Sequence, residues 1–406
     1  MKIRSFQLIV SIIFLAACQN EKLKIQQIDF STTYKFSSEI EKQLETDTIA
    51  SKYQRSAGVY AQKADYRNAL IHWDSAMGIY ERKYSHEEED SIREKYSVVN
   101  AKDYIIEEAQ NHKVVIINEA HHNSMHRAFT KSLLSELYEK GYKNLGLEAL
   151  DIGNNLDSAL NSRGYPIQRT GYYTKDPQFG DLVRQALEIG YNVFAYERIG
   201  IFFGKQREID QARNIQKEME SRPDEKFLIH CGFDHAMEGS YPSWGKAMAA
   251  RLKEYTGIDP STINQDFYTE KSNAKFNDPL LKAIVTEESA VLIDKTSKTP
   301  LRYERGEAWT DVAILHPNTQ YLDGRPDWLF ENGNKNVSVD LNDIPIEFPV
   351  MVLAYKKGED INAAVPIDIV EVEKSTEKCH LALKRGDYEI VVTNKTESYK
   401  FEREVK

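Results

Sequence analysis

The feature that most constrains the fold is an alternation of short apolar runs with amphipathic segments between residues 111 and 335. Four of the runs have the length and the nearly continuous apolarity of strands covered on both faces, namely KVVIIN at 113–118, NLGLE at 144–148, NVFAYE at 192–197 and FLIHC at 227–231. Helical patterns lie between them, and one of these, 125–140, places Phe129, Leu133 and Leu137 on one face. The alternation predicts an α/β domain with a mostly parallel sheet and helices on both faces.

The remaining elements of this domain follow from the same patterns. Further helices are expected at 179–189, 207–220 and 244–255, and further strands at 290–294 and 311–316.

The segments that flank the domain have different patterns. In residues 46–110, small and aromatic residues recur at steps of three and four, which predicts helices and resembles a single tetratricopeptide-type (TPR-like) hairpin. A lone repeat rarely stands by itself, so a helical extension that packs on the next domain, and that could offer a surface to a protein partner, is the preferred interpretation. In residues 336–406, short apolar runs alternate with turn residues, which predicts a small β-sandwich without a chemical role.

The N-terminus has the form of a secretion signal, residues 1–17. Lys2 and Arg4 precede the apolar run 8–17, which ends in small residues directly before Cys18. The run is too short to span a bilayer as a stable helix. The order resembles the lipobox of bacterial lipoproteins, although an ordinary signal peptide with a chance cysteine is the alternative.

The lipobox resemblance implies that Cys18 is the mature N-terminus and carries acyl chains such as palmitate. Several acyl chains anchor a protein far more firmly than one. The chain would then be held in the bacterial outer membrane, facing the periplasm or the surface. Gln19 is not the aspartate that would indicate retention in the inner membrane. Residues 18–45 are polar without a clear period, which predicts a tether between lipid and fold.

Composition excludes some classes of function. The formal net charge of −10 argues against nucleic acid as a partner and against broad electrostatic adhesion to anionic lipid. Beyond Cys18 the chain has two cysteines, Cys231 and Cys379, so a disulfide framework is not expected.

Polar residues that can do chemistry follow four of the predicted strands. They are Glu119, His121 and His122 after the first, Glu148 after the second, Glu197 after the third, and His230 and His235 at and after the fourth. Ligands of open parallel sheets bind beyond the carboxyl ends of the strands. A rim of imidazoles and carboxylates can supply acid–base groups or metal ligands there, while the alternative is a set of surface residues on exposed loops.

The stretch from Asn118 to Glu148 resembles the superfamily that contains erythromycin esterases, ChaN-type haem-binding lipoproteins and TraB/Tiki membrane proteases. The shared pattern is Gly-Glu-X-His or Gly-Glu-X-X-His after the first strand, then a helix and a strand that ends in Glu. Glu119 matches the motif glutamate, His121 fits the shorter spacing and His122 the longer one.

Two later stretches of the α/β domain also resemble this superfamily. Arg207-Glu208 is similar to its Arg-Asp helix opening, and Gly232 to His235 is similar to a second Gly-X-X-His element. Departures are Asn118 for the first glycine, His126 where esterase members often have glutamate, and Glu208 for aspartate.

The resemblance to the esterases implies a hydrolase of an ester or related acyl bond, with a small-molecule substrate. His122 or His121 would activate water, Glu119 and Glu148 would orient the imidazole, and His235 and Arg207 would stabilise the oxyanion. Substrate contacts are expected from His126, Glu197, His230, His316 and Arg325, the last two in a loop region that could equally be a connector.

Other functions remain open on the sequence. The resemblance to Tiki proteases implies a peptide substrate and a divalent metal such as Mn, Co or Zn, with His121 and His235 as ligands, although no HExxH-type motif supports it. The resemblance to ChaN implies haem binding, and a purely structural envelope protein is a third possibility. No Gly-x-Ser-x-Gly elbow is present, which disfavours a serine hydrolase, and Cys231 is expected to be a buried thiol.

Overall fold

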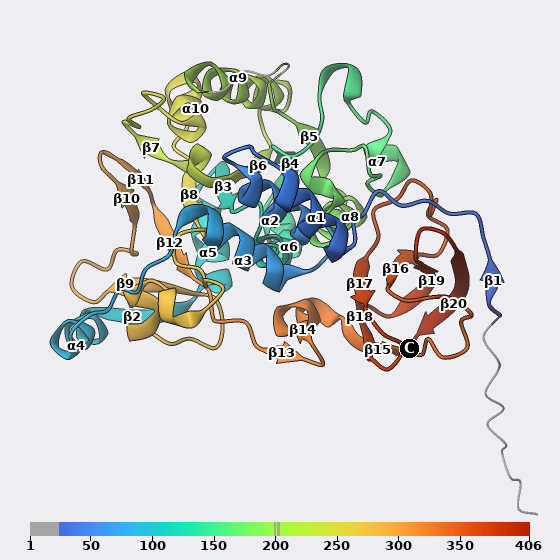
Figure 1. Ribbon diagram of the computed structural model, residues 1–406. Helices are drawn as coiled ribbons and strands as arrows, with labels where there is room; N and C mark the ends of the chain where they lie inside the picture. Colours follow the sequence, from blue (N-terminus) through green and yellow to red (C-terminus); the bar gives the residue numbers. More distant parts are fainter. Residues whose placement is uncertain (1–23, 199, 201–203) are drawn as a thin grey trace, which may run out of the picture.

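The computed structural model describes residues 24–198, 200 and 204–406, and an eight-stranded sheet forms its centre (Figure 1). The strands, in their order across the sheet, are β2 (Tyr96–Asn100), β9 (Ala290–Asp294), β12 (Val312–Leu315), β8 (Ser261–Asn264), β3 (Val114–Glu119), β6 (Lys226–Gly232), β4 (Tyr142–Leu147) and β5 (Asn192–Ala195). All neighbours from β12 to β5 pair in parallel, whereas β9 pairs antiparallel with both β12 and β2. The sheet is therefore mixed, and antiparallel pairing replaces the expected parallel pairing at one edge.

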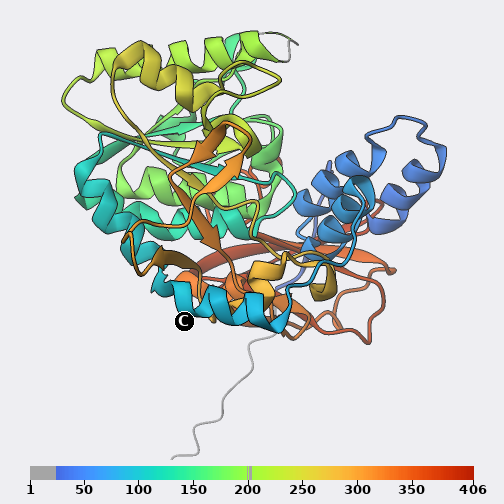
Figure 2. The same cartoon turned by 90° about the vertical axis from the view of Figure 1, so that its left-hand side faces the viewer.

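Helices cover both faces of this sheet, as predicted. Along β3, Val115 and Ile117 face one apolar core, while Val114 and Ile116 face another, because alternate side chains of a strand point to opposite faces. The first core is covered by α5 (Ala101–Glu108), α6 (Met125–Glu139) and α8 (Pro177–Ile189). The second core is covered by α9 (Lys205–Ser221) and α10 (Met248–Thr256), and Figure 2 shows the layers. β3, β4 and β6 are thus buried on both faces, which explains their apolar sequences.

The sequence patterns did not predict two strands of this sheet. β8 has the sequence STIN, whose mixed polarity hides a fully buried strand, since Thr262 and Asn264 find hydrogen-bond partners in the interior. β2 lies within the segment 46–110, which was predicted to be helical throughout, and its residues are only half-buried at the sheet edge. The α/β domain therefore begins before residue 111.

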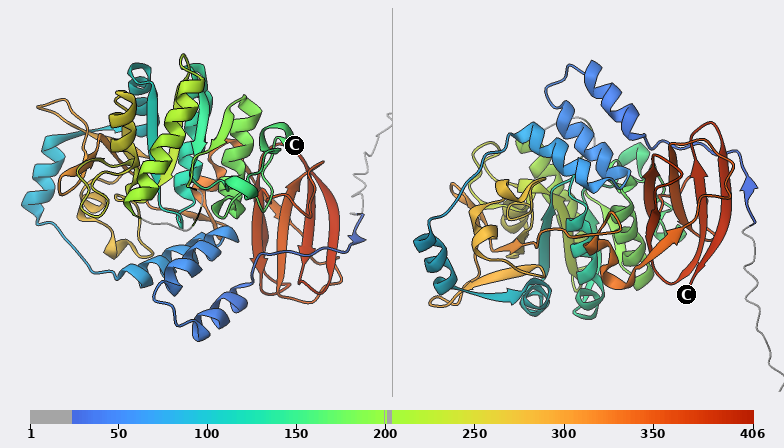
Figure 3. Two further views of the ribbon diagram at one scale, coloured as in Figure 1. Left: turned by 90° about the horizontal axis from the view of Figure 1, so that it is seen from above. Right: turned by 60° about the horizontal axis from the view of Figure 1, so that its bottom comes forward.

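Between residue 24 and β2, the structure has four helices. They are α1 (Ser37–Thr46), α2 (Lys52–Gln62), α3 (Tyr66–Met77) and α4 (His86–Lys95). Tyr60 and Ala61 of α2 share a small core with Ala69 of α3, and the two helices lie side by side against the α/β domain (Figure 3). The expected helical extension packed on the next domain corresponds to this pair, whereas its classification as TPR-like remains a prediction.

The expected tether, residues 18–45, is folded over most of its length. β1 (Gln26–Gln27) pairs with the C-terminal strand, and Phe30, Tyr34 and Phe36 are buried in a core shared with the C-terminal strands. The prediction missed this because three aromatic residues in a polar stretch show neither a helical nor a strand period. The part of this segment before residue 24, which includes Cys18, lies outside the described residues, as does the predicted signal.

The C-terminal residues form two antiparallel sheets that share one apolar core, which agrees with the expected pattern of short strands. One sheet has the order β1, β20 (Ser398–Val405), β19 (Gly386–Thr393), β16 (Val350–Lys356) and β17 (Asp368–Val372), and the other pairs β15 (Lys335–Val339) with β18 (Cys379–Leu383). Short elements complete the chain, namely α7 (Leu160–Arg163), α11 (Pro279–Ala283), β7 (Glu238–Gly239), β10 (Tyr303–Arg305), β11 (Ala308–Thr310), β13 (Tyr321–Leu322) and β14 (Arg325–Pro326).

Candidate active site

The centre of the candidate site is a histidine that a buried carboxylate holds in place. Glu119 is the last residue of β3, and its Oε1 accepts a hydrogen bond from Nδ1 of His121 at 2.8 Å. The bond places the proton of a neutral imidazole on Nδ1 and leaves a lone pair on Nε2. Nε2 has no hydrogen-bond partner among the described residues, and the His121 side chain is 18% exposed. His121 is therefore oriented, accessible and able to accept a proton.

An arginine at the base of the site fixes Glu119. Arg127, on the first turns of α6, donates through Nε and Nη2 to the two oxygens of Glu119 at 2.6 and 2.7 Å, and through Nη1 to Asp176 at 2.5 Å. All three side chains are at most 1% exposed. Burial by itself would raise the pKa of Glu119, but Arg127 and His121 hold that pKa well below its usual range. Glu119 is thus a permanent carboxylate in a rigid setting.

A second cluster lies around Arg207, on the first turns of α9. Its guanidinium donates to Glu148 and Glu197, which follow β4 and β5. Burial by itself would raise the pKa of Glu148, but His235, Arg207 and the Gly232 N–H lower that pKa to about 2. The structure therefore brings together Glu148, Glu197 and His235, three of the residues predicted from strand ends. The positive charge of Arg207 lies between the two carboxylates.

Both ring nitrogens of His235 are engaged in this second cluster. Nδ1 lies 2.8 Å from Oε2 of Glu208, and Nε2 lies 2.8 Å from Nη1 of Arg207. Burial would lower the pKa of His235, but the carboxylates of Glu148 and Glu208 outweigh it and raise that pKa. The bond from Arg207 nevertheless requires a lone pair on Nε2, so a protonated His235 would lose that bond and would turn its Nε2–H toward Glu148, 3.7 Å away.

Gly232, the last residue of β6, joins the two clusters. Its N–H donates to Oε2 of Glu148 at 2.5 Å, and the ring of His121 lies directly over its Cα. A Cβ at this position would lie 2.3 Å from Cε1 and 2.5 Å from Nε2 of His121, closer than real contacts allow. The site therefore requires glycine here for space.

We expect Gly232→Ala to lower the turnover number about 100-fold, because a shift of the imidazole of about 1 Å misplaces the proton acceptor. The matched control is Gly146→Ala on the neighbouring β4, whose added Cβ would press on Phe194 and Ile229 instead of His121. It should lower the free energy of unfolding and leave the turnover number nearly unchanged. Steady-state kinetics and urea unfolding of both variants separate the two effects, and equal turnover numbers in the two variants would contradict this role.

The accessible side of His121 faces a cavity of about 510 Å³, here named the His121 cavity. Its lining comes from α2, α3, the loop after β3, the loop before α8 and the turn after β6: Ser51, Gln54, Arg55, Gly58, Trp73, His121, His122, Tyr172, Tyr173 and Phe233. Tyr173 stacks on His121 with ring centroids 3.9 Å apart, and its hydroxyl has no hydrogen-bond partner in the part of the chain that the structure describes. The N-terminal helices thus form one wall of the site.

His122 faces the same cavity but is built differently from His121. It is 5% exposed, and burial lowers its pKa well below the usual value. Its ring stacks on Trp73 with centroids 4.1 Å apart, and no carboxylate among the residues that the structure describes is hydrogen-bonded to it. Of the two histidines that the sequence offered as a base, the geometry favours His121.

Four residues expected to contact substrate are buried in the structure. His126 is fully buried and accepts the N–H of Ala120 through Nδ1, which closes the turn after β3. His230 is buried beneath Glu119, with its Nε2 at 3.5 Å from Oε2 of that residue.

The other two lie away from the described cavities around His121. His316 contacts Ser289 and Gln265 through its two ring nitrogens, and it is 1% exposed. Arg325 pairs with Asp368 of β17 and so attaches the C-terminal sheets. A polar residue after an apolar run can close a turn or join two modules as readily as it can face a ligand, and a substrate contact of these four residues stays a prediction. Glu197, the fifth residue in that set, does lie in the Arg207 cluster.

The described residues do not form an arrangement that suits a metal ion. Residues 24–198, 200 and 204–406 contain no group of three or more His, Cys, Asp or Glu side chains placed to hold one. Of the proposed ligands His121 and His235, the second has no free lone pair in this arrangement. The described residues therefore do not fit the metal-dependent alternative.

Several residues of the site were not found from the sequence. Neither the strand ends nor the family pattern singles out Arg127, Asp176, Trp73 or Tyr173. The one available signal was Arg127 at a helix position eight residues after Glu119, because a buried carboxylate needs a cation nearby. Trp73 and Tyr173 are distant in sequence from the motif, so only the fold brings them to it.

The two cysteines in the described residues, Cys231 and Cys379, are buried free thiols, and burial raises the pKa of Cys379 to about 12. Within the described ranges, none of the helices combines the length and the hydropathy needed to cross a bilayer.

The sequence matches no protein-family model and no curated protein. Among solved structures, the type III effector HopBA1 is similar at 15% identity and a TM-score of 0.31, over 43% of this chain and 90% of that one. RRSP, a MARTX toxin effector domain from Vibrio vulnificus CMCP6, is similar at 16% identity and a TM-score of 0.28, over 50% of this chain and 43% of that one.

The C-terminal region of the Pasteurella multocida toxin, described as having a thiol-protease-like catalytic triad, is similar at 11% identity and a TM-score of 0.30, over 84% of this chain and 51% of that one. At such TM-scores these likenesses establish neither fold nor function for this chain, and membership in the esterase, ChaN and Tiki superfamily stays a prediction.

Proposed function

We propose that this chain is a hydrolase of an ester or related acyl bond, in which Nε2 of His121 takes a proton from the attacking water. The observation that carries the proposal is the buried series Arg127, Glu119 and His121, which ends on an accessible imidazole lone pair in a cavity. A carboxylate that accepts the Nδ1 proton fixes the tautomer and stabilises the imidazolium that forms during proton transfer.

Arg207 and His235 have positioning roles in this proposal, in place of the direct oxyanion contacts expected from the sequence. Arg207 already donates to Glu148, Glu197 and His235. Its main effect is to hold Glu148, which in turn holds the backbone of Gly232 under the ring of His121.

The oxyanion donor that the geometry favours is Tyr173. Its ring stacks on His121, it lines the same cavity, and its hydroxyl has no partner among the residues described. Burial raises the pKa of Tyr173, so the hydroxyl stays protonated at neutral pH and can donate to a developing negative charge.

We expect Tyr173→Phe to lower the turnover number about 100-fold with little change in KM, since one oxyanion donor contributes about 10²–10³ in turnover. The control is Tyr172→Phe, which alters a neighbouring, 51% exposed tyrosine of the same cavity. A fall in both variants, or in neither, would contradict the assignment.

The proposed activity is tested with p-nitrophenyl esters of short acids in ¹⁸O-labelled water. We expect release of p-nitrophenol and entry of one ¹⁸O into the acid product, because the mechanism forms the new bond from water. Failure to hydrolyse any ester of the series would overturn the proposal, and a Soret band on addition of haem to the same protein would support a ChaN-like binding protein instead.

We also propose that the chain acts at the bacterial outer membrane through a lipid anchor on Cys18. Radiolabelled palmitate should be incorporated into the expressed protein and lost in Cys18→Ser. Incorporation that is equal in the two proteins would contradict the anchor.

A further inference from the structure

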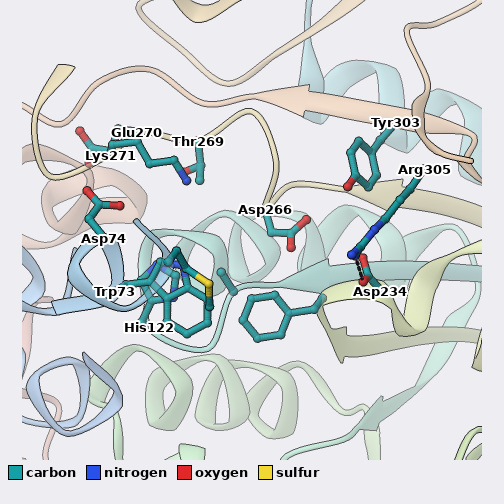
Figure 4. Close-up of a pocket in the computed structure, with 13 residues that line it drawn as sticks. Trp73, Asp74, His122, Asp234, Asp266, Thr269, Glu270, Lys271, Tyr303 and Arg305 are labelled. Carbon is teal, nitrogen blue, oxygen red and sulfur yellow. Dashed lines mark hydrogen bonds and ion pairs between the residues drawn. The ribbon is translucent and has the colours of Figure 1, made fainter. Parts of the chain in front are cut away.

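A second cavity lies on the other side of the Trp73 and His122 rings from the His121 cavity. We name it the Asp266 cavity, and it has a volume of about 380 Å³ (Figure 4). Its lining comprises Trp73, Asp74, Met77, Ala120, His122, Phe233, Asp234, Asp266, Thr269, Glu270, Lys271, Tyr303 and Arg305. Trp73, His122 and Phe233 line both cavities, so the two cavities adjoin at these aromatic side chains.

The charges around the Asp266 cavity are unequal. Four carboxylates line it, and two cations, Lys271 and Arg305, face them. Arg305 is committed to Asp234, which it contacts at 2.6 Å. Two of the carboxylates, Asp74 and Glu270, accept hydrogen bonds from neighbouring loops. The cavity as a whole carries an excess of negative charge.

Asp266 lies in the middle of this cavity, and its side-chain hydrogen-bond donors are uncharged. Its Oδ1 accepts hydrogen bonds from the side-chain amides of Asn118 at 3.0 Å and Asn264 at 2.6 Å, which carry no charge. No ion pair reaches Asp266 from the residues described. Burial and the nearby Asp234 raise the pKa of Asp266 to about 6, so the carboxylate is ionised at neutral pH but lacks a cation.

His122 provides an independent sign of a missing ligand. It is 95% buried, and its Nδ1 has no hydrogen-bond partner within the described part of the chain. Since its low pKa keeps the ring neutral, Nδ1 can accept a hydrogen bond. Figure 4 shows His122 stacked with Trp73 at one end of the cavity, with Asp266 in the middle. Aromatic faces and a carboxylate together are the usual surroundings of an organic cation.

We propose that the Asp266 cavity binds a protonated amine of the substrate, between the carboxylate of Asp266 and the Trp73 and His122 rings. The proposal rests on the proposed hydrolase function for its catalytic consequence, because it makes the substrate an ester or related acyl compound with an amino group near the scissile bond. Asp266 and Nδ1 of His122 are the acceptors that this cavity offers to the ammonium. The acyl chain then lies along Trp73, His122 and Phe233, which line both cavities, so that its carbonyl carbon reaches the His121 cavity.

Binding is tested without catalysis by titrating n-butylamine into the full chain carrying His121→Gln. Calorimetry at pH 7.5 should show binding that n-butanol does not reproduce. Asp266→Asn should weaken the binding at least about tenfold, the loss expected for one charge-assisted hydrogen bond. Glu307→Gln removes an exposed carboxylate outside the cavity and is the matched control, which should bind as before.

A second variant, at Lys271, should change the affinity for n-butylamine in the opposite direction, so the test does not depend on the folding of Asp266→Asn. The Lys271 ammonium lies in the cavity near His122 and repels a bound amine. Lys271→Gln should therefore tighten n-butylamine binding several-fold. Binding that is absent in the His121→Gln protein, or unchanged in both cavity variants, would overturn the proposal.

Catalysis separates this proposal from the proposed function. The probes are ethyl 6-aminohexanoate and ethyl heptanoate, which differ by an ammonium in place of a methyl group. We expect kcat/KM to favour the amino ester at least about tenfold, and Asp266→Asn to abolish that preference. If the protein hydrolyses both esters equally well, the amine-site proposal is contradicted and the hydrolase proposal stands. If it binds n-butylamine but hydrolyses neither ester, the hydrolase proposal is contradicted and the amine-site proposal stands.

Discussion

Replacing His121 with glutamine should lower kcat/KM for ester hydrolysis by about 10³, because the substitution removes the accessible imidazole lone pair that the buried Glu119 orients. Glutamine keeps most of the volume between Tyr173 and Gly232 and can still donate to Glu119. The fold should therefore persist, and circular dichroism and thermal unfolding check that it does.

The matched control for this variant is His86→Gln, which changes an exposed histidine of α4. Its kcat/KM should equal that of the unchanged protein. His122→Gln tests the alternative that His122 is the base, since the sequence motif allowed either histidine. If His122→Gln abolishes hydrolysis and His121→Gln does not, the order of the two histidines is reversed and the role of the Glu119–His121 pair is refuted.

Replacing Arg127 with methionine should lower the free energy of unfolding by about 3–5 kcal/mol, because it leaves Glu119 and Asp176 buried without their shared cation. Methionine fills a similar space and adds no new polar group, so the loss reflects the unpaired carboxylates. Denaturant unfolding at pH 7 measures it. Hydrolysis should fall as well, since Glu119 would no longer be fixed beside His121.

Two further variants make this stability prediction specific. Arg93→Met breaks an ion pair with Glu89 in which the arginine side chain is 47% exposed, and it should cost less than about 1 kcal/mol. Adding Glu119→Gln and Asp176→Asn to Arg127→Met removes the buried charges and should restore part of the lost stability. A cost for Arg127→Met as small as that for Arg93→Met would show that the buried network does not stabilise the fold.

The sequence by itself determined the strands and helices of the central sheet wherever burial is uniform. β3, β6 and β4 are apolar because both of their faces are covered, and this pattern can be read without a structure. β8 and β2 could not be read in this way, since one has polar residues with internal partners and the other lies at a half-exposed edge. The antiparallel edge formed by β9 and β2 therefore depends on strand pairing over long sequence distances.

For the candidate site, the sequence determined that Glu119, His121, Glu148 and His235 gather at the carboxyl ends of neighbouring parallel strands, because the chain direction of each strand fixes where its last residue lies. Which of these side chains faces a cavity and which is engaged in an ion pair depends on contacts made across the fold. Arg127 and Arg207 form ion pairs with carboxylates from other elements, and these pairs determine which side chains remain free to face a cavity.

Only the tertiary structure decided that two cavities lie beside this edge of the sheet. The helices before β2 bring Trp73 onto His122, although the two residues belong to segments with unrelated patterns. A space between elements is set by how their side chains pack, and no local pattern records it. The sequence thus specified the chemistry available at the sheet edge, while the packing of distant segments determined which residue can act as the base and where a substrate can bind.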